Sequence, residues 1–326
     1  MQHKFTNALM LIIIIGGTIS MVSCNSGNKN KTAGNDKLKG SITISGAFAL
    51  YPLTVKWADE FEKIHPNVTV NVSAGGAGKG MADALSKMAD LGMYSKEVSQ
   101  EEIDKGAWWI AVTKDAVMAT INSDNPCLKD ITSKGITKET FSEIFITGKI
   151  KTWGQALGTK SKEELHVYTR SDACGAAEMW AKFLFNKKQE DIQGLGVNGD
   201  PGIADAVRKD IQGIGYNNLN YAYDMTTRKT YAGISVVPID LNGNGKIDPN
   251  ENFYMSLDSI QNAIQKGIYP SPPARDLYFV SAGKPTNELV LEFLKWILAD
   301  GQKFVVESGY IVLTPEKIKS EQSKIE

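Results

Sequence analysis

The chain has 326 residues, of which 42% are hydrophobic and 22% are charged, and its formal net charge is −1. This composition is typical of a soluble globular protein with one large or two medium domains and a sizeable core. The near balance of charge gives no electrostatic reason to expect nucleic acid as a partner, because surfaces that bind DNA or RNA carry a basic excess.

The N-terminus has the features of an export signal. Residues 1–24 begin with a basic start at Lys4, continue through an apolar run from Leu9 to Ile15 and end in MVSC. This pattern predicts a secretory signal peptide, because the apolar run is too short for a transmembrane helix of the mature protein. The ending resembles a bacterial lipobox, which implies lipidation at Cys24; an ordinary signal peptide with an incidental cysteine is the alternative.

A polar, glycine-containing segment, residues 25–37, follows the signal and predicts a flexible tether. We therefore expect a soluble body in the cell envelope, held by a lipid anchor and facing the periplasm. The sequence leaves open which membrane leaflet carries the anchor.

Strand and helix patterns then alternate along the body of the chain. The first strand, around Ile42 and Ile44, precedes a helix that opens at Pro52 and has Leu53, Trp57, Phe61 and Ile64 as its apolar positions. Later segments repeat the plan. Strands are expected within 67–74, 91–97, 108–122, 164–170, 233–239 and 275–283, and helices within 77–90, 137–146, 175–183 and 286–301. This alternation predicts α/β layers around parallel sheets.

Two long β-rich runs suggest how the layers are divided. Residues 108–122 are long enough to pass from one domain to another, and residues 275–283 form a second long run near the end of the chain. We therefore expect an α/β fold with two lobes joined by two hinge crossings and a ligand cleft between them. Lobe I would comprise residues 38–115 and 276–326, and lobe II residues 116–275.

Three loops share one pattern, in which a strand ends, small residues follow and a helix begins. They are SGAFALYP, SAGGAGKG and RSDACGAA. Helix starts present unpaired N–H groups to anions, and Arg170 adds a permanently charged fork that Asp172 is expected to orient. Routine strand-to-helix turns are the alternative. A nucleotide-binding P-loop is excluded, because Ser73 replaces its first glycine and Gly80 replaces its Ser or Thr.

Cys174 at the start of a helix raises a second possibility, a cysteine hydrolase. A thiol nucleophile needs a base, and His166 on the preceding strand is the only nearby candidate in the sequence. No nucleophile signature surrounds either residue. Whether Cys127 and Cys174 form a disulfide stays open.

Four stretches resemble the phosphate-binding proteins of bacterial phosphate ABC importers. They are ITKETFSEIFITGKIKTWGQ, GIGYNNLNYAY, ARDLYFVSAGKP and LKWILADGQKFVVESGYIVL, and the similarity extends from about Ser41 to Leu313. The resemblance implies a type II periplasmic binding protein in lipoprotein form. It would bind phosphate between its lobes, deliver it unchanged to a permease and act as a monomer without enzymatic activity.

The ligand residues of that family carry over only in part. Arg170 and Ser73 match, but the hydroxyl pair of the third loop falls on Cys174 and Ala176, and the first loop has no hydroxyl at Ala49 or Leu50. Ser95 stands where some members have a proton-accepting aspartate. Molybdate, tungstate or a phosphonate are therefore alternative ligands. The expected ligand-binding residues are Ala49, Leu50, Ser73, Gly75, Gly76, Ser95, Arg170, Asp172, Cys174, Gly175 and Ala176.

A separate motif predicts a calcium ion as a structural cofactor. DLNGNGKIDPNE, residues 240–251, fits the calcium loop D-x-[DN]-x-[DN]-G-x₅-E. The expected ligands are Asp240, Asn242, Asn244, Lys246 through its carbonyl, Asp248 and Glu251. The alternative is a solvated turn rich in Asn and Gly. A calcium-stapled surface binding or sensory protein without a transporter is a further functional hypothesis. Whether calcium regulates binding or only stabilises the fold stays open.

Overall fold

The computed structural model describes residues 38–326, so the predicted signal peptide, Cys24 and the tether lie outside the described residues. Nine strands form one hydrogen-bonded sheet in the order β2-β1-β3-β9-β4-β7-β5-β6, and β8 pairs with β4. The strands are β1 Gly40–Gly46, β2 Val68–Ala74, β3 Leu91–Tyr94, β4 Ala107–Asn122, β5 His166–Arg170, β6 Leu195–Val197, β7 Gly213–Asn218, β8 Ile234–Val236 and β9 Ala274–Ala282.

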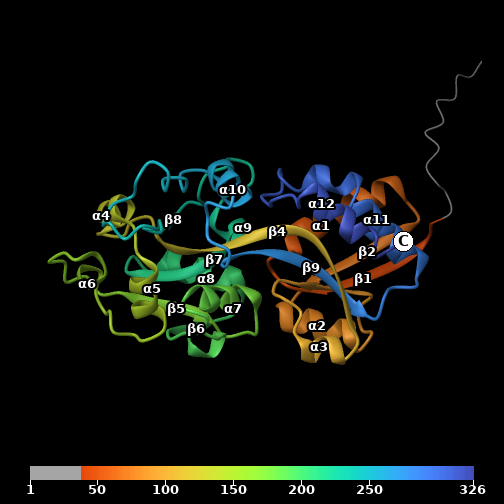
Figure 1. The fold of residues 1–326 in the computed structure, drawn as a ribbon, viewed down its shortest axis with the longest axis horizontal. Helices are drawn as coiled ribbons and strands as arrows, with labels where there is room; N and C mark the ends of the chain where they lie inside the picture. The colour runs from red at the N-terminus through yellow and green to blue at the C-terminus, as the bar shows by residue number, and fades with distance from the viewer. Residues whose placement is uncertain (1–37) are drawn as a thin grey trace, which may run out of the picture. The chain divides into compact units, whose positions relative to one another are not determined.

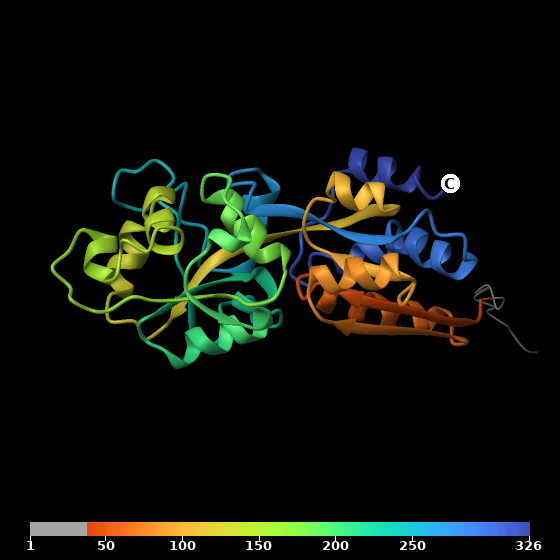
Figure 2. The ribbon, with the colours of Figure 1, turned by 90° about the horizontal axis from the view of Figure 1, so that it is seen from below.

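Helices flank these strands on both sides (Figures 1 and 2). Up to residue 183, the helices are α1 Tyr51–Ile64, α2 Ala77–Leu85, α3 Gln100–Asp104, α4 Leu128–Lys134, α5 Lys138–Phe145, α6 Trp153–Leu157 and α7 Gly175–Phe183. Those that follow are η1 Gln189–Asp191, α8 Gly199–Lys209, α9 Leu219–Ala222, α10 Leu257–Gln265, α11 Glu288–Ile297, η2 Asp300–Phe304 and α12 Pro315–Gln322.

Two hydrophobic cores divide the described body into the parts that we call lobes. The core of lobe I draws its residues from 42–112 and 277–325. The core of lobe II draws its residues from 116–274, with Ile311 added from the C-terminal segment. Only β4 and β9 contribute strand residues to both cores, and Figure 1 shows them running through both halves of the body.

The sheet is mixed, although the alternation of strands and helices predicted parallel sheets. Within lobe I, β1 pairs in parallel with β2 and β3, and within lobe II, β5 pairs in parallel with β6 and β7. The crossing strands β4 and β9 run antiparallel to each other and to their neighbours β7 and β3. The reason is topological: one crossing strand leaves lobe I and the other returns to it.

Helix α1 follows the first of the three predicted loops, SGAFALYP, and its packing agrees with its sequence pattern. Pro52 occupies its first turn, and Leu53, Trp57 and Phe61 are buried beneath it. The Trp57 Nε1–H donates to the Gly301 carbonyl at 2.8 Å, which ties α1 to the C-terminal part of lobe I. Ile64, the last of the predicted apolar positions, is 49% exposed, because it lies in the last turn, where the helix ends.

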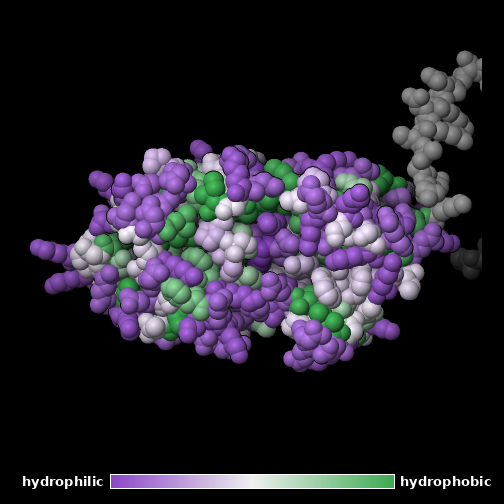
Figure 3. Space-filling view, in the orientation of Figure 1, coloured by the Kyte–Doolittle hydropathy of each residue, from purple (hydrophilic) through white to green (hydrophobic). Residues whose placement is uncertain are grey.

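Apolar side chains are scattered over the face of the body seen in Figure 3. Within residues 38–326, no helix has both the length and the apolar character needed to cross a membrane.

Candidate functional site

Loops from the two lobes meet where helices α2 and α7 begin. The Gly78 N–H of α2 donates to the Ala173 carbonyl of the β5–α7 loop at 3.3 Å. Gly76 has φ 91°, and a Cβ there would lie 2.9 Å from Asp172 Oδ2. This close approach explains why glycine occupies the position.

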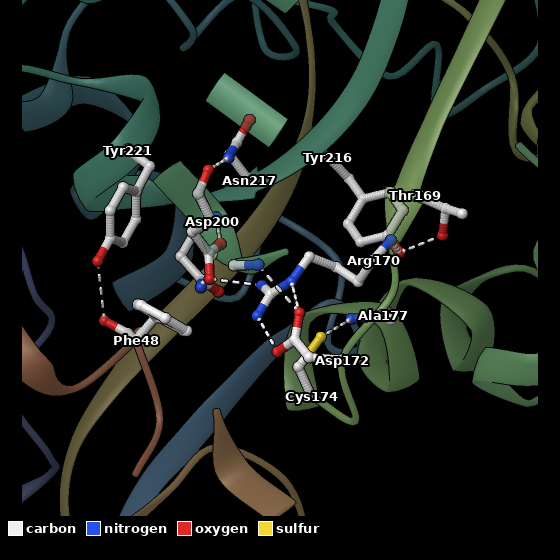
Figure 4. Close-up of polar contacts among 12 residues, drawn as sticks. Phe48, Thr169, Arg170, Asp172, Cys174, Ala177, Asp200, Tyr216, Asn217 and Tyr221 are labelled. Atoms are coloured by element: carbon white, nitrogen blue, oxygen red, sulfur yellow. Dashed lines mark hydrogen bonds and ion pairs between the residues drawn. The ribbon is translucent and has the colours of Figure 1, made fainter. Parts of the chain in front are cut away.

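Arg170, the last residue of β5, lies at the centre of this meeting point with 1% of its side chain exposed. Its Nε and Nη2 donate to the two oxygens of Asp172 at 2.7 and 2.6 Å, and its Nη1 donates to Asp200 Oδ2 at 2.6 Å (Figure 4). The Phe48 ring from lobe I covers the guanidinium, with its centroid 5.6 Å from Cζ. The guanidinium is therefore fixed on three sides.

The electrostatics of this cluster follow from burial and pairing. Burial opposes the charge of Arg170, but the carboxylates of Asp200 and Asp172 outweigh it and raise the arginine pKa. Burial likewise opposes the charge of Asp172, but the hydrogen bonds from Arg170 hold the pKa of that carboxyl below its usual range. Both groups are therefore ionised at neutral pH.

Asp200 was not identified from the sequence. It lies in the first turn of α8 and is 1% exposed, and its Oδ1 accepts from Asn218 Nδ2 at 2.7 Å. In the sequence it looks like an ordinary acidic residue at a helix start, where carboxylates are common. No local signal places it against an arginine thirty positions earlier.

The β5–α7 loop is held by internal hydrogen bonds. Cys174 is the N-cap of α7, and its Sγ accepts from the Ala177 N–H at 3.4 Å (Figure 4). Gln189 bridges the loop, accepting from the Cys174 N–H at 3.1 Å and donating to the Asp172 carbonyl at 2.7 Å. This bracing fixes the first turn of α7, where the N–H groups of Gly175 and Ala176 have no acceptor within the helix.

The geometry does not favour a cysteine nucleophile. Burial raises the pKa of the Cys174 thiol to about 11, so it is protonated at neutral pH. His166 opens β5 at the end opposite Arg170, and its ring nitrogens face Asp210 at 2.7 Å and Glu164 at 3.1 Å. Cys127 and Cys174 are both free, and Cys127 contacts Ser161.

The remaining predicted ligand residues divide into two groups. Ser95 and Gly175 lie together, because a Cβ at Gly175 would fall 2.0 Å from the Ser95 carbonyl oxygen. Ala49, Leu50 and Ala176 are buried, and the Ala49 carbonyl accepts from Tyr310 at 2.7 Å. In contrast, Ser73 is exposed and directs its Oγ to the Ile44 carbonyl, and Gly75 donates its N–H to the Gly46 carbonyl.

Lys79 of the glycine-rich loop is paired within lobe I. Its ammonium contacts Asp83, which also accepts from Ser45 Oγ at 2.6 Å. A cavity of about 580 Å³ lies elsewhere in lobe II, and its lining includes Lys138, Lys182 and Asp240 but not Arg170. The loops around Arg170 contact one another through the hydrogen bond from Gly78 to Ala173.

The predicted calcium loop forms a compact turn. The oxygens of Asp240 accept from the Gly243 and Gly245 N–H groups at 2.8 Å each. Glu251 accepts from the Leu241 N–H at 3.0 Å and the Asp248 N–H at 3.1 Å.

The side-chain amides of the loop do not point as calcium ligands would. Asn242 and Asn244 turn their NH₂ groups to Asp248, and Lys246 pairs with the same carboxylate at 2.9 Å. Within residues 38–326, no three acidic, His or Cys side chains converge as a metal-holding group. Calcium binding would therefore require these amides to flip, and it stays a prediction.

Two lobes joined by two crossing strands, with helix-starting loops that meet at a buried arginine, define a type II periplasmic binding protein. Residues 31–301 match the sequence model of the PBP superfamily domain, and the chain belongs to that superfamily. The periplasmic binding-protein fold that the sequence resemblance implies is thereby confirmed.

Curated relatives match along most of their length. The phosphate-binding protein PstS of Staphylococcus saprophyticus is 26% identical over 321 residues, which cover 96% of this chain and 92% of the relative. The phosphate-binding protein PstS of Pseudomonas aeruginosa is 26% identical over 311 residues, covering 88% and 87%.

Solved structures share the fold at lower identity. A Clostridium perfringens protein whose crystal structure holds bound phosphate matches with a TM-score of 0.69 and 21% identity, covering 84% of this chain and 100% of that one. An ABC-type phosphate transport receptor from Vibrio cholerae matches with a TM-score of 0.61 and 19% identity, covering 83% and 100%.

Proposed function

We propose that this protein captures inorganic phosphate between its lobes and delivers it to the permease of an ABC importer. The observation that carries the proposal is the buried Arg170, held by Asp172 and Asp200 where loops of both lobes meet. Asp172 and Asp200 take three of the five guanidinium N–H groups, and the two that remain, one on each Nη, suit two oxygens of a phosphate. The names of the PstS relatives support phosphate as the ligand.

The protein would hold its ligand without transforming it. A protonated Cys174 and a distant, paired His166 support a receptor over a hydrolase. The relatives are likewise named as binding proteins.

Another oxyanion is the alternative ligand. The first loop and the start of α7 present Ala49, Leu50 and Ala176 where hydroxyl donors are expected, so backbone N–H groups must supply more of the hydrogen bonds. Binding of radiolabelled phosphate, competed by molybdate, tungstate, sulfate and a phosphonate, tests this choice. The proposal requires unlabelled phosphate to compete best, and stronger competition by another anion would replace it as the ligand.

The N-terminal sequence supports a lipid anchor at Cys24 and a body that faces the periplasm; we further expect that body to act as a monomer. We expect metabolic labelling with radioactive palmitate to mark the wild-type protein but not a Cys24→Ser variant. A wild-type protein that carries no label would contradict the anchor.

A calcium ion in the 240–251 loop is a further proposal. Asp240 and Glu251 are 4% and 2% exposed, and within the described body neither lies in an ion pair with a basic side chain. Buried carboxylates without a counter-charge are costly, and a cation would relieve that cost. Ile247 anchors the loop, since its N–H donates to the Ser133 carbonyl at 2.8 Å and its side chain fills the space beside Gly135.

Calcium is expected to raise the melting temperature of the wild-type protein, by roughly 5 °C at saturation, because it binds only the folded loop. A Glu251→Gln variant should lose this shift, whereas magnesium should not reproduce it, because magnesium demands a stricter geometry. An unchanged melting temperature in calcium would contradict the proposal. Phosphate affinity measured with and without calcium then separates a structural staple from a regulator.

A further inference from the structure

A buried chain of polar groups connects Arg170 to the two strands that cross between the lobes. Its first member is Asp200, whose two oxygens are divided between partners. Oδ2 accepts from Arg170 Nη1 at 2.6 Å, and Oδ1 accepts from Asn218 Nδ2 at 2.7 Å and from the Asn218 N–H at 3.2 Å. The backbone carbonyl of Asp200 accepts from Asn217 at 3.0 Å (Figure 4).

The chain continues from Asn218 to the crossing strands. Asn218 Oδ1 accepts from Arg275 Nη2, and the same nitrogen lies 3.5 Å from Asp115 Oδ2. Asp115 in β4 and Arg275 in β9 are register partners, and both are buried. Each lies where its strand passes from one core to the other: Asp115 between Val112 and Ala116 of β4, and Arg275 between Ala274 and Leu277 of β9.

The two ends of this chain of polar groups differ in how many of their polar atoms have hydrogen-bond partners. At Arg170 the contacts to Asp200 and Asp172 are all between 2.6 and 2.7 Å. At the crossing strands, Asp115 Oδ1 and the Nε and Nη1 atoms of Arg275 are buried without a hydrogen-bond partner within the described residues. Further hydrogen bonds strongly stabilise a buried charged group. A rearrangement of the crossing strands that gave partners to Asp115 and Arg275 would therefore be favourable.

We propose that Asp200 is a positioning residue for Arg170, and that the chain Asp200–Asn218–Arg275–Asp115 makes the orientation of this arginine depend on the bend of the crossing strands. This inference rests on the proposed function of the Arg170 site. Asp172 already accepts hydrogen bonds from two of the three guanidinium nitrogens and supplies a negative charge. Asp200 is therefore not needed merely as a counter-charge. The distinctive contribution of Asp200 is that one carboxylate oxygen accepts from Arg170 and the other accepts from Asn218, which contacts Arg275.

Two variants test the link at different points. Asp200→Asn keeps the shape of the side chain and removes the negative charge that faces Arg170. Asn218→Ala leaves the Arg170–Asp200 contact in place and removes the connection to Arg275. The matched control is Asp205→Asn, which lies on the same helix but pairs with Arg208 at the surface.

Two readouts are needed for each variant. Phosphate affinity is measured by calorimetry. The distance between spin labels at Met88 in lobe I and Met255 in lobe II, which are 75% and 77% exposed, is measured with and without phosphate. Melting temperatures check that every variant is folded.

We expect Asp200→Asn and Asn218→Ala each to weaken phosphate binding roughly ten- to a hundredfold and to broaden the interlobe distance distribution, while Asp205→Asn changes neither. Wild-type affinity and an unchanged distribution in folded Asn218→Ala protein would overturn the link. If the wild type binds no phosphate, the proposed function fails. The distance distributions of the ligand-free variants still decide the link in that case, because they do not depend on the ligand.

Discussion

Arg170→Ala is expected to abolish measurable phosphate binding. The guanidinium is the permanently charged fork where the loops of both lobes meet, and each charge-assisted hydrogen bond lost is worth about 1.5–3 kcal/mol. The change also leaves the buried Asp200 and the partly buried Asp172 without their shared partner, which should lower the free energy of unfolding by about 3–5 kcal/mol. Calorimetry with phosphate and denaturant unfolding measure the two effects separately.

A second substitution separates charge from geometry at this position. Arg170→Lys keeps the positive charge but cannot contact both Asp172 and Asp200 through a planar fork, so it should fold better than Arg170→Ala and still bind phosphate weakly. Arg208→Ala, at an exposed arginine paired with Asp205, is the matched control and should behave as wild type. Tight phosphate binding by the folded Arg170→Lys protein would show that the ligand does not depend on this guanidinium fork.

Gly175→Ala is expected to weaken phosphate binding by roughly ten- to a hundredfold through overpacking. The added Cβ would fall 2.0 Å from the Ser95 carbonyl oxygen and 2.5 Å from Ser95 Oγ. Ser95 follows β3 in lobe I and Gly175 opens α7 in lobe II, so the clash opposes the approach of the lobes. The melting temperature of the ligand-free protein should change little, because opening the cleft relieves the clash.

Gly202→Ala provides the control for this prediction. Gly202 lies inside α8, and the nearest atom to an added Cβ is 3.6 Å away, so alanine should be neutral or slightly stabilising. Wild-type phosphate affinity in Gly175→Ala would mean that the lobes do not need the approach seen here in order to hold the ligand.

Much of the fold was predictable because its signals are local. Hydrophobic periodicity placed α1, α7 and α11, and the length of the β4 run indicated a strand passing between two cores. The strand directions were predicted less well. A local pattern does not distinguish parallel from antiparallel pairing, which depends on how β4 and β9 connect the lobes.

The site likewise contains contacts between neighbours in the sequence, which were predictable, and contacts between distant residues, which were not. Arg170 and Asp172 are two residues apart in one loop, so their pairing was visible in the sequence. The contacts of Asp200 with Arg170 and Asn218, and that of Asn218 with Arg275, join residues brought together only by the assembled sheet. Ser73 stays a prediction: it occupies the expected loop position, and its hydroxyl is directed to the Ile44 carbonyl at 3.4 Å.

The most direct test of phosphate capture is calorimetric titration of phosphate into the ligand-stripped wild-type protein. We predict saturable binding with one phosphate per chain, and loss of the signal in Arg170→Ala. A folded wild-type protein that gives no binding signal with phosphate would contradict the proposed function.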